Sequence, residues 1–175
     1  MSDIDTRSLR QCVGAIVFNE QGHILLGKRS ANKKSAIGKV RYDNWQCPQG
    51  GVEEGEDRHK AVLRELNEEV GLLADYVRYV SVIADPLVYL HTDKESKNRG
   101  QSITWFFFYM PSAQIIQCRL DNEPEPEFDE LAWRPFSDLT NEQLGVNFKV
   151  DMYQQLLELS SKPIDIIQEH LASMR

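Results

Sequence analysis

The stretch of residues 50–72, GGVEEGEDRHKAVLRELNEEVGL, constrains this chain more than any other feature. If residues 57–70 form a helix, Glu65, Glu68 and Glu69 occupy positions i, i+3 and i+4, and their carboxylates crowd one strip of its surface. Like charges at this spacing repel one another by roughly 0.2–0.5 kcal/mol per pair. A solvated acidic helix would tolerate that repulsion, whereas a bound cation would remove it. Hard divalent cations such as Mg²⁺ prefer carboxylate oxygens, so the spacing favours a metal site.

The remaining residues of the stretch predict where this helix lies and where it ends. Val62, Leu66 and Val70 recur every four residues, which predicts a buried apolar stripe on a flank separate from the acidic strip. Gly71 predicts the end of the helix, because a residue without Cβ tolerates the left-handed turn there. The glycine-rich residues 50–55 predict a tight loop whose backbone approaches a ligand closely.

Taken together, these residues resemble the Nudix box. Its fixed positions and spacings are matched by Gly50, Glu56, Arg64-Glu65-Leu66, Glu68-Glu69 and Gly71-Leu72. The resemblance implies a hydrolase of nucleoside diphosphates linked to another group, with Mg²⁺ as cofactor and Mn²⁺ as an alternative. It also implies that the Gly50 carbonyl, Glu65, Glu68 and Glu69 hold the metal, and that Arg64 pairs with Glu56.

Length and composition limit the class of protein. A chain of 175 residues buries a core without disulfides, and we predict a single domain over residues 1–175. The net charge of −7 argues against nonspecific nucleic-acid binding through a basic surface, but not against an anionic substrate. Three widely spaced cysteines, and the lack of a long apolar run or an apolar N-terminal segment, predict a cytoplasmic protein with no disulfide, zinc site or membrane partner.

Apolar runs and turn residues predict the other elements. Strands are expected at residues 12–18, 23–27, 76–84, 103–110 and 131–136. Helices are expected at 57–70, at 151–159 and, as a short one, after Pro163. Residues 30–44, 91–100 and 122–129 are expected to be loops. The mixture indicates an α+β sandwich, and the Nudix resemblance implies a mixed sheet between helices.

The segment before the box narrows the resemblance. Trp45-Gln46-Cys47-Pro48-Gln49-Gly50-Gly51 is similar to a segment shared by diadenosine polyphosphate hydrolases and bacterial RNA pyrophosphohydrolases, and further matches extend over residues 9–160. Cys47 replaces a bulky apolar residue, which predicts local repacking and retained activity. Two stretches depart from the pattern: the basic loop 30–44 is longer than in the bacterial relatives, and Glu53-Glu54 replaces uncharged residues.

A polyphosphate chain is bound by positively charged side chains, and a nucleobase stacks on a flat apolar side chain. Arg29 and Lys149 are predicted to clamp phosphates, with exposed solvated bases as the alternative. Tyr89 and Phe148 are predicted to stack on a purine, although core packing explains an aromatic residue equally well. Trp105 lies within an apolar strand and is predicted to be a core residue.

The remaining predicted site residues come from the resemblance. Glu127 matches a Pro-Glu-Phe element of the RNA enzymes, which implies a further metal ligand or a base. Its position on an acidic loop is also compatible with simple solvation, and three acids are close rivals: Glu123, Glu125 and Asp129. The resemblance also places Gln49 and Gln101 against the substrate.

The predicted mechanism is metal-assisted hydrolysis of a phosphate chain. Metal ions neutralise phosphate charge and help to ionise an attacking water, and an unassigned carboxylate takes the proton. We rank a dinucleoside polyphosphate hydrolase of the diadenosine tetraphosphate type first, because of the acidic net charge and Glu53-Glu54. An RNA 5′-pyrophosphohydrolase is the close alternative, favoured by the basic loop 30–44, and a non-catalytic binding subunit is third. The sequence gives no prediction of oligomeric state.

Overall fold

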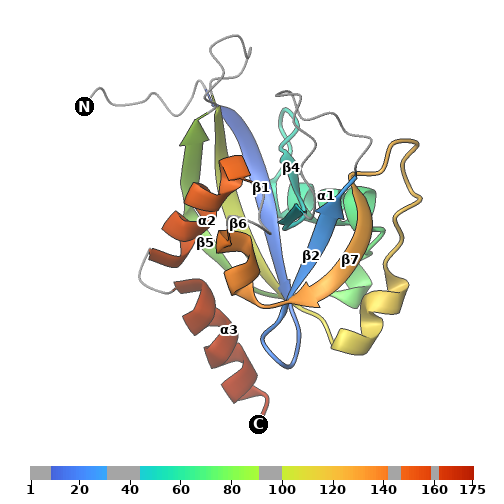
Figure 1. The fold of residues 1–175 in the computed structure, drawn as a ribbon, viewed down its shortest axis with the longest axis vertical. Helices are drawn as coiled ribbons and strands as arrows, with labels where there is room; N and C mark the ends of the chain where they lie inside the picture. Colours follow the sequence, from blue (N-terminus) through green and yellow to red (C-terminus); the bar gives the residue numbers. More distant parts are fainter. Residues whose placement is uncertain (1–8, 31–43, 91–99, 142–146, 159–161) are drawn as a thin grey trace.

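The computed structural model describes residues 9–30, 44–90, 100–141, 147–158 and 162–175. In the described residues four strands precede the first α-helix, and two α-helices follow one another after the last strand, so the elements are grouped instead of alternating, which confirms the α+β class (Figure 1). Most of the predicted basic loop 30–44, including Lys33, Lys34, Lys39 and Arg41, lies outside the described residues. The same holds for most of the predicted loop 91–100.

A mixed sheet forms the centre of the molecule (Figure 1). Five strands follow one another in the order β3-β2-β1-β6-β5, while β4 pairs with β1 and β7 pairs with β2. β1 and β6 run parallel, and the other pairs are antiparallel. The strands are β1 (Arg10–Phe18), β2 (Ile24–Arg29), β3 (Trp45–Gln46), β4 (Gln49–Gly51), β5 (Arg78–Leu90), β6 (Gly100–Tyr109) and β7 (Phe128–Arg134).

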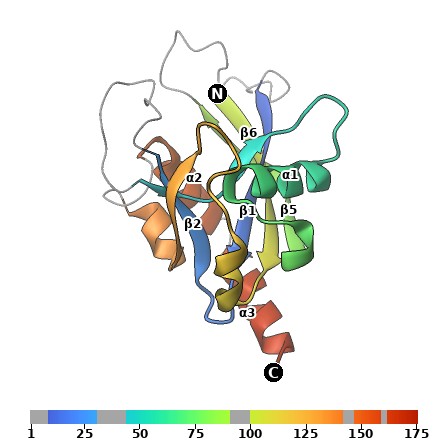
Figure 2. The same cartoon turned by 90° about the vertical axis from the view of Figure 1, so that its right-hand side faces the viewer.

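Helices cover both faces of the sheet, as comparison of Figures 1 and 2 shows. Side chains alternate between the faces of a strand, so β1 sends Val13, Ala15 and Val17 to the face that packs against α1. Its opposite face packs against α2 and α3, which confirms the predicted mixed sheet between helices. The helices are α1 (Arg58–Val70), α2 (Asn147–Glu158) and α3 (Lys162–Ser173), with 3-10 turns at η2 (Ala74–Tyr76), η3 (Ser112–Gln117) and η4 (Phe136–Thr140).

Local sequence explains both ends of α1. The Asp57 side chain accepts hydrogen bonds from the backbone N–H groups of His59 and Lys60, which caps the first turn. Gly71 adopts a φ of 64° and ends the helix in the left-handed conformation, as its position predicts. Both the helix and its stop are therefore confirmed.

The observed β5 is longer than the predicted strand 76–84. It continues to Leu90 because a register shift between Ile83 and Leu87 takes up the irregularity around Pro86. The last helix, expected to be short, spans 12 residues. Trp105 is fully buried, which confirms the prediction of a core residue.

The cysteines and the helices relate to the predictions about disulfides and membrane segments. Cys12, Cys47 and Cys118 are free thiols, and the first two are buried. Among the described residues, no helix combines the length and the apolar character that crossing a bilayer requires.

Candidate active site

The acidic strip of α1 is organised by Arg64. Its guanidinium makes two contacts of 2.9 Å to the Glu56 carboxylate and donates to the Gly51 carbonyl oxygen at 2.8 Å. The hydrogen bonds from Arg64, and a further one from the Glu53 backbone N–H, lower the pKa of Glu56 to about 2. The predicted Arg64–Glu56 pair is present, and it ties the glycine loop to the helix.

Arg64 also holds two of the three glutamates predicted as metal ligands on α1. Its Nη1 lies 2.9 Å from Glu65 Oε1 and 3.0 Å from Glu68 Oε2. Glu69 has a different partner, because its Oε2 accepts the backbone N–H of Gln49 at 2.9 Å. Burial, reinforced by the negative charge of Glu127, holds the pKa of Glu69 well above its usual range.

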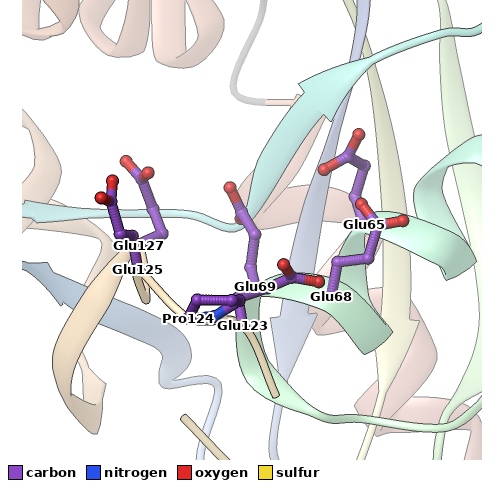
Figure 3. A pocket seen from close by; sticks show the side chains of 7 residues that line it. All are labelled: Glu65, Glu68, Glu69, Glu123, Pro124, Glu125 and Glu127. Atoms are coloured by element: carbon purple, nitrogen blue, oxygen red, sulfur yellow. The ribbon is translucent and has the colours of Figure 1, made fainter. Parts of the chain in front are cut away.

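A carboxylate pocket of about 620 Å³ lies between α1 and the loop before β7 (Figure 3). Glu65, Glu68 and Glu69 line it from the helix, and Glu127 lines it from the loop. The chain thus brings Glu127 to the three box acids from far away in the sequence. Glu123, Pro124 and Glu125 line the same pocket, so the rivals Glu123 and Glu125 also lie there.

A second pocket of about 420 Å³ adjoins the first. We call it the basic pocket after Arg10, Arg29 and Lys149, which line it. It contains five of the six predicted substrate-binding residues: Arg29, Gln49, Tyr89, Gln101 and Lys149. Glu65, Glu69 and Glu127 line both pockets, so the two form one continuous site. Phe148 belongs to α2, but its side chain lies outside the described part of the structure.

Polar contacts link the cations of the basic pocket to Glu127. Lys149 Nζ donates to Gln46 Oε1 at 2.7 Å, and Gln46 Nε2 lies 3.4 Å from Glu127 Oε1. The same carboxylate oxygen lies 3.5 Å from Arg29 Nε. Burial, together with the positive charge of Arg29, lowers the pKa of Lys149 to about 8. The basic pocket can therefore bring positive charge to a phosphate chain beside the carboxylates.

Two residues of this site were given no role by sequence reasoning. Gln46 contacts both Lys149 and Glu127. Its position in the Trp45-to-Gly51 segment was the feature of the sequence that could have indicated a role in the site. Arg10 lies over Gly51, where an added Cβ would come within 2.6 Å of its Nη2. The pairing of β1 with β4 brings these two residues together, and sequence spacing does not reveal that pairing.

The donor set fits a hard divalent cation. Every side chain that lines the carboxylate pocket, apart from Pro124, offers carboxylate oxygens. At Gly50 a Cβ would overlap the Glu65 carboxylate, so only glycine lets this backbone approach the acids. Among the described residues, no three acids, cysteines or histidines surround a common point that a metal ion could occupy. The acids that would hold the ion line one pocket, but two of them, Glu65 and Glu68, are hydrogen-bonded to Arg64.

The chain is similar to known proteins over most of its length. Residues 8–156 match the family described as NUDIX domain. The chain is 36% identical to an RNA pyrophosphohydrolase of Gluconacetobacter diazotrophicus over 163 residues, which cover 90% of this chain and 94% of the relative. It is 35% identical to an RNA pyrophosphohydrolase of Rhizobium meliloti, over 85% of this chain and 90% of the relative.

Solved structures share the fold at lower identity. A MutT protein from Methanosarcina mazei superposes with a TM-score of 0.59 at 22% identity, covering 84% of this chain and 91% of that one. An Ap4A hydrolase of C. elegans, in a binary complex, gives a TM-score of 0.58 at 16% identity, covering 88% and 99%. The family match covers most of the chain, and the two RNA pyrophosphohydrolases resemble it over nearly their full length. The chain therefore belongs to the Nudix family and is a Nudix pyrophosphohydrolase.

Proposed function

We propose that this enzyme is a divalent-metal-dependent RNA 5′-pyrophosphohydrolase that trims the triphosphate end of RNA. The observation that carries the proposal is the continuous site, in which a carboxylate pocket and a basic pocket share Glu65, Glu69 and Glu127. The choice of RNA is supported by the curated relatives, which are named RNA pyrophosphohydrolases. The sequence alone ranks this substrate second, and the names of the relatives support it over the dinucleotide.

In this proposal the carboxylate pocket holds Mg²⁺ or Mn²⁺. Glu65, Glu68, Glu69, Glu127 and the Gly50 carbonyl are the ligands that would bind it. When bound, the metal supplies charge neutralisation on the phosphates and lowers the pKa of an attacking water. A carboxylate of the same set accepts the proton of that water.

The basic pocket binds the phosphate chain and orients it. Arg29 and Lys149 neutralise its oxygens, and Arg10 adds a third cation over the glycine loop. Gln49 and Gln101 provide amide groups, and Tyr89 provides an aromatic face for a base. Around the buried Lys149, charge–charge contacts are stronger than in water.

A second candidate substrate is a dinucleoside polyphosphate of the diadenosine tetraphosphate type. Glu53 and Glu54 are exposed on the glycine loop, where their negative charge would repel the continuing backbone of an RNA. A short dinucleotide would extend less far across this loop. We also propose that residues 1–175 act as one domain in the cytoplasm, where either substrate would be met.

The deciding experiment offers both substrates to one enzyme preparation at matched Mg²⁺. We expect triphosphorylated RNA to be turned over with a kcat/KM at least about tenfold higher than that of diadenosine tetraphosphate, a difference of about 1.4 kcal/mol. The products to measure are monophosphorylated RNA ends and released pyrophosphate or phosphate. A preference of tenfold or more for the dinucleotide would overturn the choice of RNA and restore the second candidate.

A further inference from the structure

Helix α2 contacts the segment that precedes the glycine loop through two side chains one turn apart. Lys149 Nζ donates to the Gln46 side chain at 2.7 Å. Tyr153, four residues further on, accepts the backbone N–H of Cys47 at 3.2 Å through its hydroxyl. Positions i and i+4 share one face of a helix, so α2 holds two consecutive residues of the segment from the same side.

This segment leads directly to both sets of candidate metal ligands. Two residues beyond Cys47, the backbone N–H of Gln49 donates to Glu69, and Gly50 follows. One residue before Cys47, the Gln46 side chain reaches Glu127. On the opposite side, Ala15 N–H of β1 donates to the Pro48 carbonyl at 2.9 Å. The segment is therefore fixed between β1 and α2, and a shift at Cys47 would move the partners of Glu69 and Glu127 together.

The Tyr153 hydroxyl lies in a dry environment. Tyr153 and Cys47 are both fully buried, and the Tyr153 ring packs against Trp105 with centroids 5.7 Å apart. A buried backbone N–H without an acceptor is energetically unfavourable, so the backbone at Cys47 is expected to shift when the Tyr153 hydroxyl is removed. Tyr153 is not among the described side chains that line either pocket. Its effect on catalysis must therefore act through the position of the segment and not through contact with substrate.

We propose that Tyr153 is a positioning residue, which fixes residues 46–49 so that Gln49 and Gln46 present Glu69 and Glu127 to the metal site. The proposal rests on the proposed function for its kinetic readout. Tyr153→Phe keeps the ring and removes only the hydroxyl. Leu156→Val is the matched control, because Leu156 is buried in the same core, on the same helix, and contacts the sheet by packing alone.

Two measurements test this role. In the metal-free protein, amide hydrogen exchange of a peptide covering residues 45–51 is expected to be at least about tenfold faster in Tyr153→Phe than in Leu156→Val, because the Cys47 N–H has lost its acceptor. In the assay, kcat is expected to fall about tenfold in Tyr153→Phe with KM within about twofold, since small misplacements of a catalytic group cost rate. Leu156→Val is expected to keep kcat within about twofold.

Two results would overturn the positioning role and leave Tyr153 as a core residue. In the first, Tyr153→Phe has the same exchange rate and kcat as Leu156→Val. In the second, the activity lost in Tyr153→Phe equals the fraction of the protein that is unfolded. If the wild-type protein turned over neither RNA nor dinucleotide, the proposed function would fail. The exchange comparison would still decide whether Tyr153 holds the segment.

Discussion

The two pockets of this site are assembled in different ways. The carboxylate pocket takes three of its acids from five consecutive residues of α1, and the caps and apolar stripe of that helix are local in sequence. Apart from the shared Glu65, Glu69 and Glu127, the basic pocket takes its side chains from β1, β2, β3, β4, β5, β6 and α2. Most of the predicted metal ligands are therefore encoded in one short stretch, with Glu127 added by the fold, whereas the predicted substrate-binding residues come together only through the whole fold. Mutations should separate the two: changes to the acids of α1 should abolish the reaction, and changes to the cations of the basic pocket should alter binding.

Glu69→Gln is expected to have the largest effect. We expect kcat to fall about 10³-fold or more, because the substitution removes a charged oxygen ligand from the shared wall of the two pockets. Stability should be unchanged or higher, since desolvation and the nearby charge of Glu127 raise the pKa of the wild-type carboxylate and so disfavour its charged form. Steady-state kinetics and thermal unfolding measure the two effects, with the exposed Glu54→Gln as control. Wild-type turnover in Glu69→Gln would refute the site.

Lys149→Met is expected to have an intermediate effect, mainly on KM. Loss of a charged hydrogen-bond donor to phosphate should lower kcat/KM by about 10–100-fold. The pKa of Lys149 is lowered to about 8, so the wild-type amine is charged below pH 8 and neutral above it. The wild-type kcat/KM should therefore decline as the pH rises through about 8.

The pH profile of Lys149→Met should lack this decline. The matched control is Lys60→Met on the exposed side of α1, which should behave as the wild type. If Lys149→Met and the wild type lost activity in parallel above pH 8, another group would be responsible for the decline.

Asp57→Ala is expected to have the smallest effect. It removes the N-cap of α1, so stability should fall by about 1 kcal/mol and the Tm by about 2–4 °C. The kcat/KM should stay within about twofold, because the other contacts of Arg64 still hold the loop on the helix. The exposed Asp121→Ala provides the control for loss of one charge. A large loss of activity in Asp57→Ala would show that the cap also positions the acids.

The sequence predicts well those features of this molecule that depend on residues close together in the chain. The period of Val62, Leu66 and Val70 and the capping residues Asp57 and Gly71 act within one helix, so they are readable without tertiary information. The extension of β5 beyond Pro86 is not readable, because it depends on pairing with β6 across a register shift.

The same limit applies to the site. Gln46 gains its place from contacts with Lys149 and Glu127, both far away in the sequence. Arg10 gains its place from the pairing of β1 with β4. The repulsion expected among the three box acids is also modified by a neighbour, because Arg64 pairs with Glu65 and Glu68. Unlike the contacts of Gln46 and Arg10, the pair with Glu68 was readable from helical spacing, because Arg64 stands four residues before Glu68, whereas the Nudix resemblance implies only the pair of Arg64 with Glu56.

We expect one cation site to span α1 and the loop that carries Glu127. Calorimetric titration with Mn²⁺ tests this, using the wild type, Glu127→Gln and the control Glu130→Gln, an exposed acid that lines neither pocket. Glu127→Gln should weaken Mn²⁺ binding at least about tenfold, equivalent to about 1.4 kcal/mol, while Glu130→Gln should stay within about twofold. Equal Mn²⁺ affinity in the wild type and Glu127→Gln would contradict it, because α1 alone would then hold the metal.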